Sequence, residues 1–273
     1  MNNSANINAG FFNTIFVIPI LNILLILYSF FSFLKFPGAL GFSIIGLTFL
    51  VNFLLLPINK KQRAMTEKLN ELKPHLDKLQ KKYKNDQAKL QSEQLKLYQQ
   101  AGVNPGLGCL LPFIQLPFFI ALYSVLSLFL LEHKGVNIFE NINKAVYFSF
   151  LKINSIDTSF FGFNLALSPQ KSGIWYYLLI PIITGLLQYI QINLITPKAK
   201  IEKEENQKKQ EKDKEKNNQE DIQKMMNIQM KFLMPAFIAW FAYTLPVGLA
   251  LYWNVYSLFN IIQYRKPVNL KKN

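Results

Sequence analysis

The stretch from Leu47 to Lys60, LTFLVNFLLLPINK, joins a long apolar run to a strongly basic segment. It closes a region, 36–59, that contains no Asp, Glu, Lys, Arg or His. A helix of about 20 apolar residues crosses the hydrocarbon core of a bilayer. The stretch therefore predicts the end of a membrane span, and it places an amide, Asn52, inside that span.

Three more regions, 102–131, 172–196 and 232–264, are also free of charged residues and histidine. The last is long enough for two helices, which Pro246 and Gly248 would separate. Because the chain is 51% hydrophobic and yet carries a net charge of +14, apolar and basic residues must occupy different segments. We predict an all-α, polytopic membrane protein with five transmembrane helices, at 39–59, 105–131, 174–196, 228–245 and 247–265.

Basic residues orient these spans. The segment 60–101 is rich in Lys, whereas the loop 132–173 holds only Lys134, Lys144, Lys152 and Lys171. Positively charged loops stay in the cytoplasm. We therefore expect 60–101, the charged linker 197–227 and the short basic tail 266–273 inside, the loop 132–173 outside, the amino end outside and the carboxyl end inside.

Within the N-terminal segment 1–38, the stretch 11–34 is apolar and uncharged. Two placements are open, an amphipathic helix at the outer interface and a sixth span. We expect the interfacial helix, because no Lys or Arg precedes it and polar residues interrupt it. Neither a basic n-region nor a cleavage pattern indicates a signal peptide, and no Arg- and Ser-rich transit sequence precedes Phe11, which predicts a bacterial plasma membrane.

The segment 60–101 has a heptad rhythm, with Met65, Leu69, Leu72, Leu76, Leu79 and Tyr83 spaced 4, 3, 4, 3, 4. With a turn near Lys84, it predicts a cytoplasmic helical hairpin that Pro74 should bend or interrupt. Its basic face would attract anionic headgroups or ribosomal RNA by charge, without sequence readout. The lysines expected to make this contact are Lys78, Lys81, Lys82 and Lys84.

Catalytic machinery is missing from the sequence. Cys109 is the only cysteine, the two histidines fall on opposite sides of the membrane, and 102–108 lacks the Lys-Ser/Thr of a phosphate-binding loop. We predict no catalytic residues, no metal, no cofactor and no enzymatic activity. The linker 197–227, a mixture of Lys, Glu, Asn and Gln, is assigned no chemistry.

The spans do contain uncharged polar residues on single helix faces. Thr48 and Asn52 are four apart, Gln188 and Gln191 three apart, and Asn254 begins a polar stripe on the last span. A buried amide without a partner costs several kcal/mol by order of magnitude. Two interpretations remain open: the amides bond helices together, or they line a water-containing cavity that holds polar parts of another chain.

The stretch 102–123, GVNPGLGCLLPFIQLPFFIALY, resembles the YidC family of membrane protein insertases. LTFLVNFLLLPINKKQ, PIITGLLQYIQ and LPVGLALYWNVYSLFNIIQ match the family in the same order. The resemblance extends from about Phe11 to Gln263 and is to the compact five-span bacterial form.

This resemblance implies an insertase and chaperone for membrane proteins that uses no nucleotide. It implies a hydrophilic groove, open to cytosol and lipid, and nascent membrane proteins, the bilayer, the Sec translocon and the ribosome as partners. The groove would be lined by Thr48, Asn52, Gln188, Gln191 and Asn254. The alternatives are an assembly scaffold with little insertion activity and, less favoured because charges and repeats are missing from the spans, a channel.

Asn52 occupies the position where the family pattern places an arginine. An amide hydrates a groove and forms hydrogen bonds, but it carries no net charge. The hypothesis that follows is a weaker dependence on acidic residues in the substrate than arginine-bearing relatives show.

Overall fold

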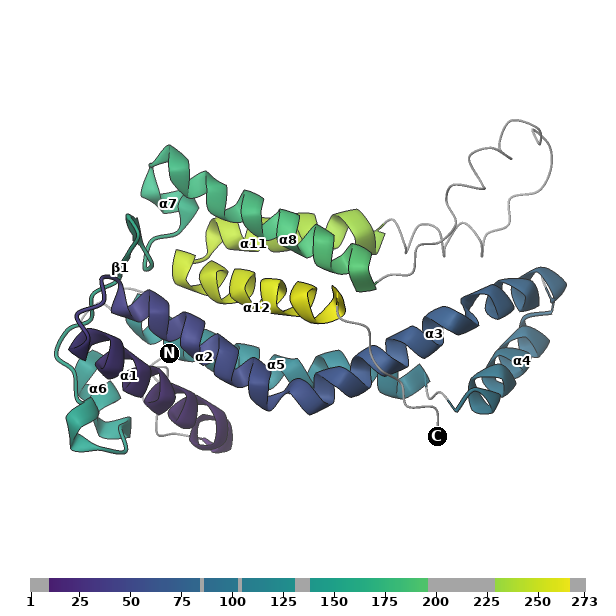
Figure 1. Cartoon of the computed structure of the whole chain (residues 1–273), viewed down its shortest axis with the longest axis horizontal. Helices are drawn as coiled ribbons and strands as arrows, with labels where there is room; N and C mark the ends of the chain where they lie inside the picture. Colours follow the sequence, from purple (N-terminus) through teal and green to yellow (C-terminus); the bar gives the residue numbers. More distant parts are fainter. Residues whose placement is uncertain (1–9, 84–85, 103–104, 131–137, 196–228, 266–273) are drawn as a thin grey trace.

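The computed structural model describes residues 10–83, 86–102, 105–130, 138–195 and 229–265. Most of these residues are helical, and the regular strands among them form a single two-stranded hairpin. The helices gather in an elongated bundle, from which a pair of helices projects at one end (Figure 1). The chain is thus a mostly helical protein, as the apolar runs predict.

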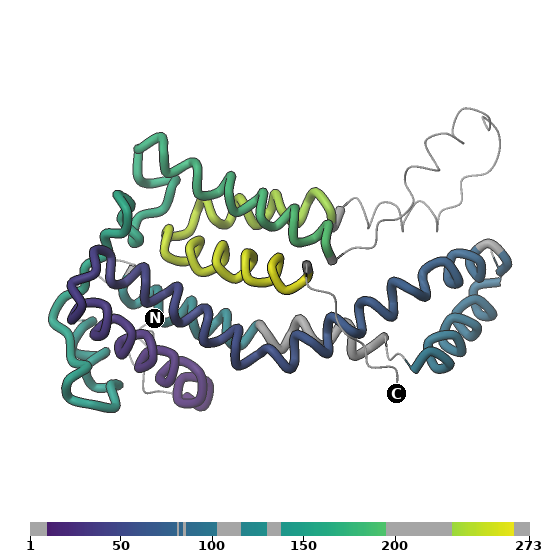
Figure 2. Tube along the Cα trace, in the orientation of Figure 1, coloured from purple at the N-terminus to yellow at the C-terminus, as the bar shows by residue number. Residues whose placement is uncertain are grey.

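The first part of the bundle contains α1 (Ile18–Phe33), α2 (Ala39–Leu54) and α5 (Pro105–Leu130), with the π-helical turn η1 (Asn13–Val17) before α1. The second part contains α8 (Leu179–Ile195) and α11 (Met234–Thr244), preceded by η3 (Trp175–Leu178) and η4 (Gln229–Leu233). The last helix, α12 (Val247–Arg265), packs against α2 and α8 and so joins the two parts (Figure 2).

Several helices have the length and composition of membrane spans. Among the described residues, Asn13–Phe33 and Trp175–Leu194 are long and apolar enough to cross a bilayer. Taken together as one bent helix, α2 and α3 (Leu56–Lys82) are also long and apolar enough to cross a bilayer, with an angle of 63° between the two halves. The apolar part of α5 that is described, Leu116–Phe129, is shorter. These helices identify a membrane protein.

Helix α3 leaves the bundle and packs against α4 (Gln87–Gln100). It continues through Pro74, where the sequence predicted a bend or an interruption. Pro74 is exposed, so water can satisfy the carbonyl that a proline leaves without a donor. The break lies instead at Leu55, where Pro57 starts α3 from its first turn.

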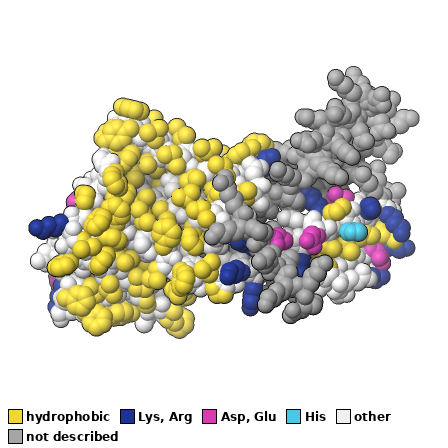
Figure 3. Space-filling model, viewed as in Figure 1, with side chains coloured by type: hydrophobic (Ala, Val, Ile, Leu, Met, Phe, Trp, Pro, Cys, Tyr) yellow, Lys and Arg dark blue, Asp and Glu magenta, His cyan; other side chains and the backbone are white. Residues whose placement is uncertain are grey.

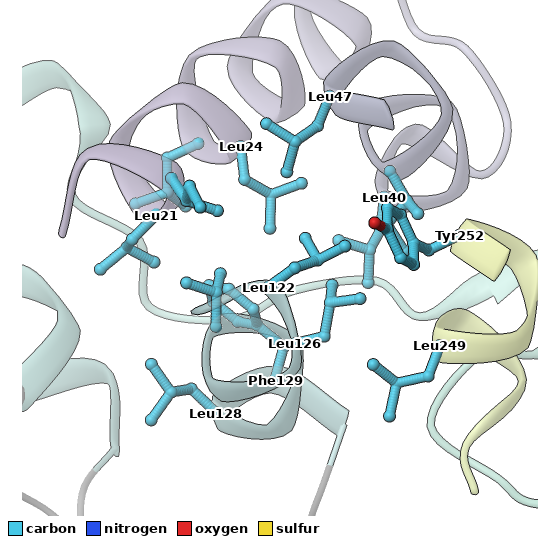
Figure 4. Packing of buried hydrophobic residues seen from close by; sticks show 14 of the residues in the cluster. Leu21, Leu24, Leu40, Leu47, Leu122, Leu126, Leu128, Phe129, Leu249 and Tyr252 are labelled. Carbon is cyan, nitrogen blue, oxygen red and sulfur yellow. The ribbon is translucent and has the colours of Figure 1, made fainter. Parts of the chain in front are cut away.

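Leucines of α1, α2 and α5 interlock to form the core. Leu24, Leu47 and Leu126 are at most 1% exposed and point toward one another, and Leu249 and Tyr252 of α12 close the cluster (Figure 4). Because lipid tails are as apolar as these side chains, close packing rather than the hydrophobic effect holds such helices together in a bilayer.

The segment between α5 and α8 covers one end of the bundle. It contains α6 (Ile138–Ala145), η2 (Ser149–Leu151), β1 (Ser159–Phe160), β2 (Phe163–Asn164) and α7 (Pro169–Ser172). The strands pair antiparallel, with Ser159 opposite Asn164. The backbone N–H groups of Val247 and Gly248 donate to the carbonyls of Leu167 and Leu165, so this segment is attached to the start of α12.

Apolar and charged side chains occupy separate parts of the surface, as they do of the sequence. Apolar side chains cover the visible face of the bundle, whereas most of the charged ones in view gather toward the end that carries α3 and α4 (Figure 3). Large exposed apolar residues on the bundle include Phe30, Ile182 and Trp240. An apolar patch of this extent fits a lipid-facing surface.

Candidate functional site

Polar side chains that are buried or half-buried lie on the packed helices of the bundle, and this set is here called the polar seam. Its members lie on α2, α3, α8 and α12, with α12 in the middle. They are Thr48, Asn52, Asn59, Gln188, Gln191, Asn254, Ser257, Asn260 and Gln263. The seam contains all five residues that the sequence predicted for a groove.

The side chains of Thr48 and Asn52 turn back onto their own helix. Thr48 Oγ1 donates to the carbonyl of Ile44 at 2.6 Å, and Asn52 Nδ2 donates to the carbonyl of Thr48 at 2.8 Å. Both residues are at most 1% exposed. Asn52 Oδ1, however, has no hydrogen-bond partner among the described residues. The Asn52 side chain is therefore held in place by its amide N–H group, while its carbonyl oxygen is available to accept a hydrogen bond from water or from another chain.

Gln188 has a different role from Asn52. Its Nε2 donates to Ser257 Oγ of α12 at 2.9 Å, in a buried contact between helices. This is the kind of bond that fastens membrane helices to one another. For Gln188, the structure favours the interhelical interpretation.

The residues predicted to line a groove come from three helices. Asn52 lies on α2 and Gln188 on α8, and α12 packs against both of these helices. Asn254 is supplied by α12 itself. Two of the predicted residues therefore lie on α2, two on α8 and one on α12, which packs against both of the other helices.

Most amide side chains of the seam have an atom that forms no hydrogen bond with the described residues. Six of them, on α2, α3, α8 and α12, have a buried nitrogen or oxygen atom without a partner among the described residues. They are Asn52, Asn59, Gln191, Asn254, Asn260 and Gln263. Native proteins leave few buried polar atoms unpaired. A group of this size is polar enough to hold water or the polar groups of another chain.

Arg63 is a member of this region that sequence reasoning missed. It is 6% exposed, and its guanidinium carbon lies 4.8 Å from the centroid of the Tyr264 ring on α12. The sequence did contain a signal, because Asn52, Asn59 and Arg63 are spaced 7 and 4 and fall on one helical face. The predicted span ended at residue 59, where the basic segment begins.

The end of the seam at Asn254 adjoins a small cavity of about 140 Å³. Seven apolar side chains from the 160–165 segment, α8 and α12 line it together with Asn254. This end is therefore enclosed by apolar groups, whereas the other end lies beside the basic helices.

The projecting helices form a basic cleft. It has a volume of about 290 Å³ and is lined by Lys78, Lys82 and Lys96 together with His75. Lys96 donates to Glu93 at 2.7 Å, and this hydrogen bond holds the pKa of Glu93 below its ordinary value. Of the predicted contact lysines, Lys78 and Lys82 are exposed; the Lys81 side chain and Lys84 lie outside the described residues.

Comparisons with known proteins agree with the family resemblance of the sequence. Residues 30–269 match the family model described as 60Kd inner membrane protein. A membrane protein insertase YidC of Oceanobacillus iheyensis is 30% identical over 96% of this chain and 87% of its own length. A YidC insertase of Clostridium tetani is 29% identical over 85% and 81% of the two chains. The inner membrane ALBINO3-like protein 2 of Chlamydomonas reinhardtii is 32% identical, over 83% of this chain and 49% of its own length.

Proposed function

This chain belongs to the 60Kd inner membrane protein family, the family of the YidC insertases, and from that premise we propose that it inserts small membrane proteins and assists the folding of larger ones. The observation that carries the mechanism is the set of unsatisfied amides in the polar seam. Polar groups cross bare hydrocarbon only at a high free-energy cost. A hydrated seam lowers this barrier, and burial of the substrate's apolar helix in lipid drives the step without nucleotide.

The proposed topology has five spans: α2 with the start of α3, α5, α8, η4 with α11, and α12. The basic helices α3 and α4 then lie in the cytoplasm and the 138–173 segment outside. In this orientation the apolar side chains that line the cavity beside Asn254 close the outer end of the seam. The basic end of the seam opens to the cytosol.

We place α1 at the outer interface rather than across the membrane. Asn22, one turn after its start, donates to the carbonyl of Ala145 and accepts from the N–H of Tyr147. Tyr28 accepts from the N–H of Asp157. The outer segment, with charged residues such as Lys144 and Asp157, thus runs beside the helix, and these charges do not tolerate the bilayer centre.

The exposed side of α1 carries large apolar residues, and this bears on how deeply the helix lies in the membrane. Ile26, Phe30 and Phe33 are exposed, while Leu21 and Leu24 face the core. The helix is therefore apolar on both sides instead of amphipathic. An interfacial helix of this kind lies below the headgroups, in contact with the acyl chains.

In this account Asn52, Thr48, Gln191 and Asn254 line the groove, and Gln188 also ties α8 to α12. The cytoplasmic helices present the contact surface for nascent chains, the ribosome or the Sec translocon, through Lys78, Lys82 and the neighbouring Lys81 and Lys84. Attraction there is by charge and does not read a nucleic acid sequence.

The Gln188–Ser257 bond favours a second candidate, an assembly scaffold whose polar residues serve packing. Depletion of the protein from its host separates the two functions. An insertase leaves small single-span substrates in the cytosol, accessible to protease from the cytosolic side. A scaffold leaves the same substrates inserted but outside their complexes, and that result would reject the insertase function.

A further inference from the structure

The cavity beside Asn254 lies between the β1–β2 hairpin, α8 and α12 and has a volume of about 140 Å³. Phe160, Phe161 and Phe163 give it aromatic walls. Asn254 is the only polar side chain among the described residues that line it. In a protein interior, an apolar cavity of roughly 150 Å³ stays dry and admits benzene. The cavity therefore has the size for one six-membered aromatic ring.

The Asn254 side chain has an unused hydrogen-bond acceptor at this cavity. Its Oδ1 is buried and has no partner among the described residues. A water molecule here would meet a single polar side chain, whereas a buried water typically makes about three hydrogen bonds. A molecule that is apolar except for one O–H or N–H donor would fill the cavity and satisfy this oxygen. The hydroxyl-bearing ring of a phenol meets both conditions.

Two of the aromatic walls are held in place by neighbouring rings. Phe160 packs edge-on against Phe42 of α2, with 5.5 Å between the ring centroids. Phe163 packs edge-on against Tyr177 at 5.1 Å, and Tyr177 accepts a hydrogen bond from the N–H of Asn164 at 2.7 Å. Aromatic pairs prefer this geometry. The walls are thus positioned for an aromatic ligand before it binds.

The third wall, Phe161, is held in a strained backbone conformation. Phe161 and Gly162 form the two-residue turn between β1 and β2, with φ values of 45° and 83°. Asn, Asp and Gly are the usual residues of such turns, and a bulky side chain at positive φ is an outlier. Strain of this kind is typically retained at ligand-binding positions. Because Phe161 lines the cavity and is 74% exposed, the cavity adjoins the surface at this turn.

The place of the cavity suits one residue type of a substrate. In the proposed topology the cavity lies at the outer end of the seam. Tyr and Trp gather at the outer ends of membrane spans, where the ring is in an apolar region and its polar group needs a partner. A substrate span beside the seam brings such a residue to this level. The volume suits the phenol ring of Tyr better than the larger indole of Trp.

We propose that the cavity binds the side chain of a tyrosine at the outer end of a substrate span and holds that span before it moves into lipid. This inference rests on the proposed insertase function. Asn254 accepts the hydrogen bond of the tyrosine hydroxyl, and the three phenylalanines surround its ring. A lipid acyl chain lacks a donor and would leave the Asn254 oxygen unpaired.

Binding is tested with two small probes, 4-fluorophenol and fluorobenzene, on the full-length protein in detergent. Their affinities are measured by ¹⁹F NMR, and micelles without protein provide the background. We expect the wild type to bind 4-fluorophenol several-fold more tightly than fluorobenzene, because only the phenol has a donor. Asn254→Leu should bring the two affinities close together. Leu251→Phe, which fills the cavity, should abolish the binding of both probes.

Two further variants separate binding from folding. Phe161→Asn places a residue that the turn favours at position 161, so it should keep or raise the unfolding temperature while weakening the binding of 4-fluorophenol several-fold. Leu258→Ala is the matched control, because it lies one turn after Asn254 on α12 and is exposed. It should bind both probes like the wild type.

A second arm tests whether the ligand belongs to the substrate. A single-span substrate is made with Tyr, Phe or Leu at the outer end of its apolar segment, and each form competes with 4-fluorophenol for the protein. The Tyr form should displace the probe at a concentration several-fold lower than the Phe form requires. The Leu form should displace it least.

Each outcome has one meaning. Equal affinities of the wild type for the two probes, or a preference for the phenol that survives Asn254→Leu, overturns the site. A bound probe that the Tyr substrate does not displace makes the cavity a site for free phenolic molecules and overturns its assignment to substrates. The insertase function is scored separately, by insertion of the same three substrates into liposomes, and a wild type that inserts none of them contradicts that function.

Discussion

The ring of Phe160 occupies the space where Gly41 has no side chain. A Cβ atom on Gly41 would lie 2.1 Å from Cδ2 of Phe160 and 2.4 Å from its Cγ. Phe160 belongs to the short hairpin over the end of the bundle, and Gly41 belongs to the first turns of α2. The hairpin is thus seated on α2 by one ring, and the carbonyls of Leu165 and Leu167, just after β2, accept backbone hydrogen bonds from the start of α12, so the 159–167 segment contacts both parts of the bundle.

Gly41→Ala should therefore displace the hairpin. Overpacking of this kind costs about 1–3 kcal/mol, and it should appear as a lower unfolding temperature in detergent. Gly46→Ala is the matched control on the same helix, because its Cβ would meet Leu27 at an ordinary 3.4 Å. That variant should be neutral or slightly more stable.

A double mutant tests the contact itself. In Phe160→Ala, the ring is gone and Gly41→Ala should have little further effect. The sum of the two single changes should thus exceed the effect of the double change. Additive losses would show that the glycine is required for another reason.

Asn52→Leu separates activity from stability. The Asn52 carbonyl oxygen is buried without a partner among the described residues, so its removal should leave the unfolding temperature unchanged or raise it. Insertion of substrates with polar amino-terminal segments should slow several-fold, because the seam becomes drier. A large loss of stability would instead identify Asn52 as a packing residue.

Gln188 and Ser257 should behave as a coupled pair. Their hydrogen bond is buried between α8 and α12, and such bonds contribute roughly 1 kcal/mol in membrane proteins. Gln188→Leu, Ser257→Ala and the double variant form a thermodynamic cycle by unfolding in detergent. A coupling energy near zero would mean that Gln188 serves the groove alone.

Asn22 should be among the most sensitive positions of α1. Its amide joins two backbone groups of the outer segment, the Ala145 carbonyl and the Tyr147 N–H, at 3.1 and 2.6 Å. Asn22→Leu leaves both without a partner and should destabilise the protein by roughly 2–4 kcal/mol. Ser32→Ala, at an exposed position of the same helix, should change stability by less than about 0.5 kcal/mol. Equal effects in the two variants would contradict the anchoring role.

Some features followed from the sequence because they depend on local composition. Long uncharged runs predicted apolar helices, since a backbone in lipid must satisfy its hydrogen bonds within the helix. Pro246 separates α11 from α12, at the place where the turn residues indicated a break. The heptad leucines predicted a cytoplasmic helical hairpin at 60–101; this stays a prediction, although α3 contacts α4. The motifs of 102–123 identified the family, which the matched residues 30–269 confirm.

Other features were decided only by the tertiary structure. Periodicity put Asn52 and Gln188 on polar faces, but it could not show that α12 stands between their helices or that Gln188 bonds Ser257. Nor could it show that Arg63, one of many basic residues after the span, is buried against Tyr264 while Lys60 and Lys61 are exposed. The physical reason is that sequence patterns fix which side of a helix is polar, whereas partners and burial depend on how distant helices pack.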